Sequence, residues 1–201
     1  MNDSYLTLEK PAQAEIKVKG SRFIGFAAPV SDSGAVHRIL AERSKKYHGA
    51  THHCYAYILG PDDSQFRYHD DGEPAGTAGK PILDIIQGKG LMRVLCVVTR
   101  YFGGTKLGTG GLVRAYGRCA KDTLDATKIV ERFHMQRIHI KFDYDLTGTV
   151  MSILSKHRAS IQNKQYGEET AMEVAVRRSQ LVHLIQMLQD GSGGKVDITK
   201  P

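Results

Sequence analysis

The chain has few cysteines and no paired cysteine motif. Its 201 residues include only Cys54, Cys96 and Cys119, and no CxxC pair. An odd number this small does not supply the disulfide framework of a small secreted domain. All three lie in apolar stretches typical of buried, reduced thiols. We therefore expect a fold held by hydrophobic packing, and the length is ample for one large or two small domains.

Long hydrophobic runs are also absent. Residues 1–19 have neither the apolar core of a signal peptide nor the length of a membrane span. We expect a soluble, cytoplasmic protein with no membrane contact. The sequence shows no internal repeat, low-complexity stretch or Pro- and Ser-rich linker. Any domain boundary must therefore be inferred from the order of the predicted helices and strands.

Positive charge exceeds negative charge. The formal net charge is +7 at pH 7, residues 1–134 hold 19 Lys and Arg against 14 Asp and Glu, and residues 135–201 hold 9 against 7. A basic balance favours an anionic partner, although a solvated basic face gives the same composition. The excess lies mainly in the first part of the chain.

Glycine is abundant and concentrated in residues 70–118. This block reads DDGEPAGTAGKPILDIIQGKGLMRVLCVVTRYFGGTKLGTGGLVRAYGR, with two glycine-rich turns around an apolar strand at 92–99. Glycine permits positive φ and close backbone contact. Apolar residues at helical spacing predict a helix over Thr109–Asp125 after the second turn. Thr77 is the candidate N-cap of an earlier helix that carries Pro81 in its first turn.

The same block closely resembles the signature of the IMPACT family, including its bacterial YigZ branch. Residues 70–83 and 97–116 match the patterns DDGEP.GTAG.P and VVTRYFGG.KLG.GGL.RAY, and HHCYAY at 52–57 fits as well. The resemblance implies an N-terminal α/β domain akin to domain IV of elongation factor G and to ribosomal proteins. It also implies a ferredoxin-like C-terminal domain. Eukaryotic members regulate translation, and bacterial members are commonly suggested to act on nucleic acid or the ribosome.

The other elements follow from hydrophobic periodicity and turn residues. In the first part we expect a helix at 33–47, a turn at 60–63, and strands at 14–19, 22–30, 52–59, 66–69 and 129–133. The second part predicts a βαββαβ order over 137–144, 147–156, 160–166, 170–177, 180–189 and 195–199, with a turn at 167–169. That order is ferredoxin-like. The fold class is therefore α+β, with domains 1–134 and 135–201.

The second glycine turn, Gly103–Gly111, is the first candidate site. It is not a Walker A motif, because Thr109 and Gly110 replace the required Lys-Ser/Thr. It is not a dinucleotide fingerprint either, because Val113 replaces the third glycine. A loop before a helix start still offers N–H groups and a positive dipole end to an anion. Two interpretations stay open: a phosphate site, or glycines that only permit a tight turn and close packing.

The acidic cluster of Asp70, Asp71 and Glu73 is the second candidate. These carboxylates could bind Mg²⁺ or act as bases. They could instead cap the adjacent backbone or pair with Arg100 and Arg114. We favour the structural role.

Histidines and aromatic residues complete the candidates. The stretch His52-His53-Cys54 suggests zinc, but successive side chains of a strand point to opposite faces, so we expect no metal and no cofactor. Aromatic residues flank the second glycine turn and could stack on bases of single-stranded RNA or simply cover the core edge. They are Tyr101, Phe102 and Tyr116.

Two functional hypotheses remain. The favoured one is a non-enzymatic protein that binds RNA, the ribosome or a translation-regulating partner through a basic glycine-rich face. The alternative is a phosphate- or nucleotide-using enzyme with the glycine loop as its anion cradle. The candidate binding residues are Lys80, Arg100, Tyr101, Gly103, Gly104, Lys106, Gly108, Gly110, Arg114 and Arg118. A second surface is expected on the open C-terminal sheet, fringed by Lys141, Lys164, Arg177 and Arg178.

Overall fold

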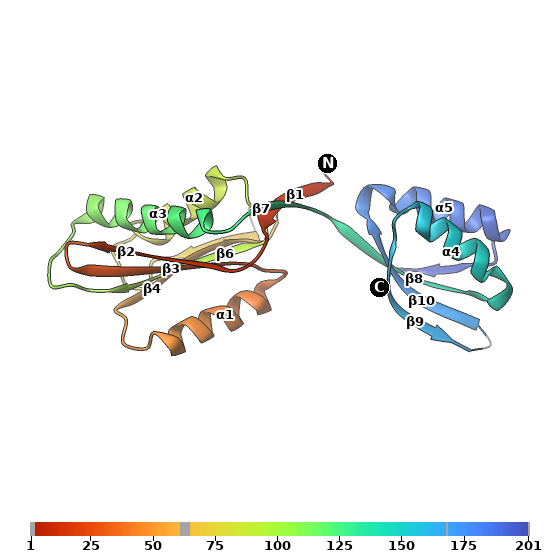
Figure 1. The fold of residues 1–201 in the computed structure, drawn as a ribbon, viewed down its shortest axis with the longest axis horizontal. Coiled ribbons are helices and arrows are strands. Elements are labelled where there is room, and N and C mark those ends of the chain that lie inside the picture. Colours follow the sequence, from red (N-terminus) through yellow and green to blue (C-terminus); the bar gives the residue numbers. More distant parts are fainter. Residues whose placement is uncertain (1–2, 61–64, 168, 201) are drawn as a thin grey trace. The chain divides into compact units, whose positions relative to one another are not determined.

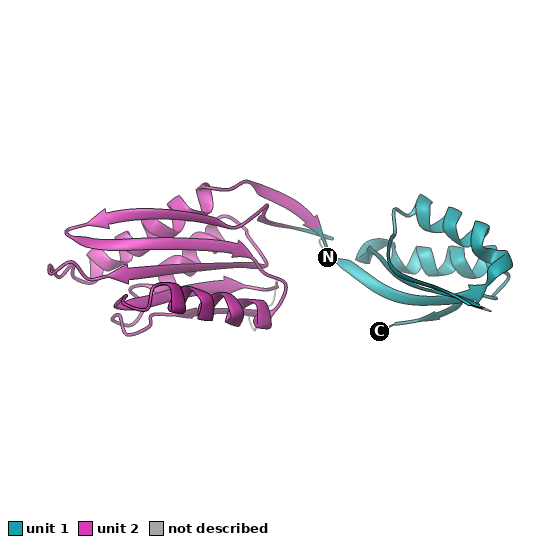
Figure 2. Cartoon of the chain, turned by 60° about the horizontal axis from the view of Figure 1, so that its bottom comes forward, with its two compact units in different colours: residues 1–5, 133–201 teal, residues 6–132 magenta. Residues whose placement is uncertain are grey.

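The computed structural model describes residues 3–60, 65–167 and 169–200. The chain forms two compact units, which are described separately (Figure 2). The N-terminal unit comprises residues 6–132, and the C-terminal unit comprises residues 133–201 together with residues 1–5. The sequence pattern does not predict that residues 3–5 belong with the C-terminal unit.

The N-terminal unit contains a five-stranded sheet in the order β2-β3-β6-β4-β5, and all its neighbouring strands are antiparallel. Central β6 is almost entirely buried, as its apolar run predicts. A separate two-stranded sheet pairs β1 with β7. The strands between residues 4 and 133 are β1 (Ser4–Leu8), β2 (Ala12–Val18), β3 (Ser21–Pro29), β4 (His52–Ile58), β5 (Phe66–His69), β6 (Val94–Tyr101) and β7 (Ile129–Phe133).

Helices cover both faces of the five-stranded sheet (Figure 1). The main core lies beneath α2 (Gly79–Gly88) and α3 (Thr109–Asp125), because both helices turn their apolar sides to the sheet. A smaller core lies beneath α1 (Ser33–Lys46), and it includes Val36 and Leu95. The predicted helices at 33–47 and 109–125 are thus confirmed to within a residue.

The C-terminal unit has the predicted βαββαβ order. Its antiparallel sheet follows the order β11-β8-β10-β9, and α4 and α5 pack on the same face around one apolar core (Figure 1). The elements are β8 (Met135–Asp143), α4 (Thr147–Lys156), β9 (Ser160–Tyr166), β10 (Glu169–Arg177), α5 (Leu181–Ser192) and β11 (Asp197–Thr199).

These elements confirm the α+β class. Two of the predicted turns, at 60–63 and 167–169, fall partly outside the described residues, which omit 61–64 and 168. Each helix among the described residues is too short or too polar to span a lipid bilayer.

Candidate functional site

The candidate residues gather at one end of the N-terminal sheet. The strand register places Arg22 opposite Tyr101 and His52 opposite Arg100, at the end of β6 furthest from Val94. We call this the distal end; it is the left end of the N-terminal unit in Figure 1. The loop between β6 and α3, which carries the second glycine turn, begins here. Antiparallel pairing therefore brings together motifs that are far apart in the sequence.

A buried ion pair lies beneath the distal end. Glu73 Oε1 accepts hydrogen bonds from Arg100 Nη1 at 2.6 Å and from the Tyr116 hydroxyl at 2.7 Å. The Glu73 and Arg100 side chains are only 4% and 6% exposed. Arg100 Nη2 also donates to Ser21 Oγ at 3.3 Å. Burial raises the pKa of Tyr116, so its hydroxyl remains a neutral donor.

This pairing changes the roles expected for two candidates. A buried charge needs a close partner, and Arg100 already has one in Glu73. Arg100 is therefore unavailable to an external anion, contrary to its place among the candidate binding residues. Tyr116 is fully buried and cannot stack on a base, so the expectation of RNA stacking is wrong for this residue.

Asp70 caps helix α2. Its carboxylate accepts from three backbone N–H groups within residues 76–79, at 2.8 to 3.0 Å. The prediction that Thr77 is the N-cap was wrong. Its hydroxyl donates to the Pro74 carbonyl at 2.6 Å, and the N-cap position is Ala78. A carboxylate at a helix start satisfies free donors and complements the dipole.

Asp71 joins the acidic turn to strand β4. Its Oδ2 accepts from the His53 backbone N–H at 2.6 Å, and its carbonyl accepts from His52 Nδ1 at 2.7 Å. The three carboxylates of the cluster thus have intramolecular partners, as the structural interpretation expected. The predicted pairing with Arg100 is confirmed for Glu73, whereas Arg114 forms no ion pair within the described chain.

The loop between β6 and α3 needs glycine at particular positions. A Cβ on Gly103 would lie 1.9 Å from the Gly20 carbonyl carbon, so no larger residue fits that contact. Gly104 and Gly108 have φ of 85° and 71°, which favours glycine. Gly110 lies in the first turn of α3 without positive φ. Close packing and tight turning therefore account for part of the glycine motif.

The start of α3 presents positive groups to solvent. Gly108 at its N-cap supplies no side chain to the helix donors, and the first turn contains no acidic residue. Lys106 and Arg114 lie on either side of this start; both are exposed, and neither forms an ion pair within the described chain. An uncapped helix start beside two cations favours a bound anion.

The remaining candidate binding residues differ in how freely their side chains could contact a partner. Lys80 pairs with Asp84, and Arg118 Nε lies 3.6 Å from Asp122 Oδ2. Among the aromatic residues, half-buried Tyr101 lies under the Arg22 guanidinium, whereas Phe102 is 48% exposed. Phe102 is therefore the flanking aromatic residue best placed to meet a partner.

The cysteines and histidines behave as the strand geometry predicts. All three cysteines are buried and free, and burial raises the pKa of Cys119 to about 12. Cys54 Sγ donates to the Asp70 carbonyl at 2.9 Å, on the side of the sheet where His52 approaches Glu73. His53 Nδ1 instead lies 3.1 Å from Thr99 Oγ1. The stretch 52–54 therefore does not converge on one point.

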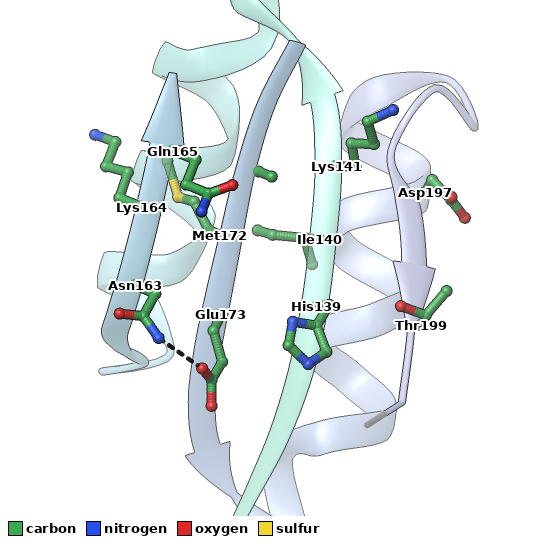
Figure 3. A pocket seen from close by; sticks show the side chains of 11 residues that line it. His139, Ile140, Lys141, Asn163, Lys164, Gln165, Met172, Glu173, Asp197 and Thr199 are labelled. Atoms are coloured by element: carbon green, nitrogen blue, oxygen red, sulfur yellow. Dashed lines mark hydrogen bonds between the residues drawn. The ribbon is translucent and has the colours of Figure 1, made fainter. Parts of the chain in front are cut away.

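The C-terminal sheet has a shallow groove of about 590 Å³ on the face shown in Figure 3. Its charged side chains are largely partnered. Glu173 accepts from Asn163 Nδ2 at 2.9 Å and from Arg137 Nη1 at 3.1 Å, and Lys141 pairs with Glu169. Of the other predicted fringe residues, Lys164 lies over Tyr166 and Arg177 over Phe133, whereas Arg178 is exposed.

Comparison with known proteins identifies the family. The model of the Impact N-terminal domain matches residues 19–124, and a domain of unknown function, DUF1949, matches residues 140–195. The IMPACT family member YvyE of Bacillus subtilis (strain 168) is 35% identical over 198 residues, covering 98% of this chain and 91% of the relative. The IMPACT family member YigZ of Escherichia coli (strain K12) is 32% identical, covering 98% and 97%.

A solved structure described as a hypothetical protein is 32% identical, with a TM-score of 0.76 and coverage of 100% of this chain and 98% of that one. The chain belongs to the IMPACT family. The resemblance noted in residues 70–83 and 97–116 is thereby confirmed.

Sequence reasoning missed two parts of the site. Ser21 contacts both Arg100 and the backbone of Gly103, yet it lies far from the glycine block in sequence. Gly20 packs against Gly103 in the same way. No local pattern marks these residues, because their partners are defined only by strand pairing.

Proposed function

We propose that this IMPACT-family chain is a non-enzymatic binding protein of the translation apparatus. It contacts RNA, including ribosomal RNA, through a basic glycine-rich face around the start of α3. This face comprises Gly103, Gly104, Lys106, Gly108, Gly110 and Arg114. One observation carries the proposal: Lys106 and Arg114 have no ion-pair partner within the described chain beside an uncapped helix start.

The chemistry of this face suits phosphate groups. Backbone N–H groups at a helix start point outward, and the dipole favours negative charge by about 0.3 to 1 kcal/mol at an exposed site. Lys106 and Arg114 add two full charges. Such contacts fix a nucleic acid by its backbone and carry no base preference of their own.

The enzymatic alternative has less support. A phosphate-using enzyme would need a metal ligand or base, and Asp71 and Glu73 were the candidates. The Asp71 carboxylate bonds the backbone of β4, and Glu73 is buried against Arg100. These bonds favour structural roles for both carboxylates and leave the loop as a binding element.

The finer fold assignments belong to the same proposal. The element order βαββαβ, the strand order β11-β8-β10-β9 and two helices on one face support a ferredoxin-like C-terminal domain. The likeness of the N-terminal domain to domain IV of elongation factor G rests on the family resemblance. We also propose domain limits of 1–134 and 135–201 and a cytoplasmic location.

A pull-down tests the binding proposal. The tagged protein is incubated with bacterial lysate at several salt concentrations, with and without RNase. We expect ribosomal components to be captured and RNase to release them. Capture that resists RNase would point instead to a protein regulator of translation.

Purified RNA then tests the face itself. Affinity falls as salt rises, and we expect Lys106→Ala with Arg114→Ala to make this fall less steep. The magnitude of the slope of log affinity against log salt should decrease by roughly 1.4, since each lost phosphate contact removes roughly 0.7 on single strands. Lys80→Ala with Arg118→Ala is the matched control, because it removes the same charge from ion-paired positions. Unchanged affinity and slope in a well-folded Lys106/Arg114 variant would reject this face.

A further inference from the structure

Three segments from distant parts of the sequence meet at the distal end, and only one of them belongs to the basic glycine-rich face. They are the β2–β3 turn at 17–22, the stretch after α1 at 45–51, and the start of the β6–α3 loop at 101–108. In Figure 1 all three lie at the same end of the N-terminal sheet. The distal end is thus a composite surface.

Specific contacts hold the segments together. The Gly103 N–H donates to Ser21 Oγ at 3.2 Å, which ties the loop to the β2–β3 turn. The Phe102 N–H donates to Thr51 Oγ1 at 3.1 Å, which ties it to the stretch after α1. Ser21 is the first residue of β3, Thr51 directly precedes β4, and Phe102 and Gly103 directly follow β6, so strand pairing brings these residues together.

The composite surface is basic throughout. The three segments contain no Asp or Glu. Arg22 pairs with Glu15 from the neighbouring strand. The five lysines are exposed and form no ion pair within the described chain. They are Lys17, Lys19, Lys45, Lys46 and Lys106.

The β2–β3 turn places Lys19 at the tip of a rigid hairpin. Lys19 and Gly20 are the only residues between the paired Val18 and Ser21, and their φ values are 45° and 82°. Two successive positive φ values in a two-residue loop define a type I′ turn, whose twist matches the strands. Phe102, the exposed aromatic residue, lies at the start of the neighbouring loop.

We propose that the distal end binds single-stranded RNA, with the lysines along the phosphate backbone and Phe102 stacked on a base. The inference rests on the proposed function and extends its site to Lys19, Lys45, Lys46 and Phe102. Charge complementarity selects a polyanion. The exposed ring selects a single strand, because a duplex keeps its base faces stacked within the helix.

Fluorescence anisotropy with a labelled oligouridylate of about 12 nucleotides tests the charge contribution on the full chain. The variant is Lys19→Asn with Lys45→Ala and Lys46→Ala; asparagine is chosen because it tolerates positive φ. We expect the magnitude of its slope of log affinity against log salt to decrease by roughly 2, because three contacts of roughly 0.7 each are lost. The control replaces Lys10, Lys128 and Arg132 by Ala, which removes equal charge from exposed positions outside the three segments.

Phe102→Leu tests stacking separately. Leucine keeps an apolar side chain but lacks a ring face, so we expect about tenfold weaker binding to the oligomer at constant salt slope. Arg100 Cζ lies 5.6 Å from the centroid of the Phe102 ring, so the melting temperature is measured beside binding, and we expect it to change little. Full affinity in this variant would remove Phe102 from the site.

The variants distinguish this inference from the proposed function. If the Lys19/Lys45/Lys46 variant binds like its control while the Lys106/Arg114 variant is weakened, the composite surface is refuted and the glycine-rich face stands. If the wild-type chain binds neither the oligomer nor ribosomal RNA at low salt, both proposals fall. Equal or tighter binding of a duplex of the same length would also overturn the choice of a single strand.

Discussion

Glu73 joins several elements of the distal end. Its carboxylate joins Arg100 on β6 to Tyr116 on α3, and the same guanidinium reaches Ser21 on β3. Three neighbouring acidic residues therefore have different roles: Asp70 caps a helix, Asp71 holds the acidic turn to β4, and Glu73 neutralises a buried cation. These tasks position the loop without using its exposed charges.

Glu73→Gln should destabilise the protein strongly. Glutamine keeps an acceptor for Tyr116, but Arg100 would remain buried without a countercharge. Breaking such a pair costs about 3 to 5 kcal/mol. Urea unfolding followed by circular dichroism measures the loss as a change in the free energy of unfolding.

A double variant separates the missing charge from a general packing effect. Glu73→Leu combined with Arg100→Met should cost clearly less than the sum of the single changes, because neither charge is then left alone. If Glu73→Gln is as stable as the wild type, the buried ion pair does not contribute to folding as described.

At the scale of elements, the sequence predicts the strand–loop–helix unit well and its anchoring poorly. The apolar run at 92–99 and the helical spacing after Thr109 identify β6 and α3, because both signals are local. The cap of α2 could not be found by searching next to the helix. Asp70 reaches back to residues 76–79 only because the intervening turn folds on itself. The Gly20–Gly103 contact likewise needs strand register.

The glycines of the loop should respond differently to alanine. At Gly104 the new Cβ meets no atom within 4 Å, so only the positive φ is penalised, at about 1 to 2 kcal/mol. Gly103→Ala should cost more, because its Cβ would overlap the Gly20 backbone. Gly110→Ala is the matched helical control, and replacing glycine within a helix stabilises by about 0.5 to 1 kcal/mol.

Thermal unfolding and RNA binding measured together separate packing from recognition. Binding lost in Gly104→Ala at an almost unchanged melting temperature would assign that glycine to ligand contact. If Gly104→Ala keeps the wild-type melting temperature and RNA affinity, the positive φ at Gly104 matters for neither stability nor binding. Gly110→Ala costing as much as Gly104→Ala would contradict the conformational explanation.

At the scale of the whole molecule, each unit has a core of its own. The Impact N-terminal domain matches within residues 6–132, and DUF1949 matches within residues 133–201. The proposed RNA contacts all lie in the first unit. The charges of the groove on the C-terminal sheet are largely partnered, and among the described residues that line it none is Phe, Tyr or Trp, although the exposed His139 lies there. A second RNA surface there is therefore less favoured than the distal end. The second unit should therefore contribute a smaller part of the affinity.

The last prediction is that residues 134–201 fold without the rest of the chain. Apolar residues of α4, α5 and the sheet enclose one continuous core, with Val150, Leu154 and Leu184 among its most buried members. The fragment loses two exposed hydrogen bonds that Ser179 donates to Asp3, and these contribute little. It also loses the bond from the His134 N–H to the Asp3 carbonyl and the Phe133 ring beneath Arg177. A domain this small is marginally stable, so we expect dispersed NMR amide signals and a low denaturation midpoint. Poorly dispersed amide signals would show that folding of the fragment depends on the first unit. In the complementary fragment, residues 1–133, RNA affinity should fall by less than tenfold, since the distal end remains complete. Loss of all binding would move the recognition site to the C-terminal unit.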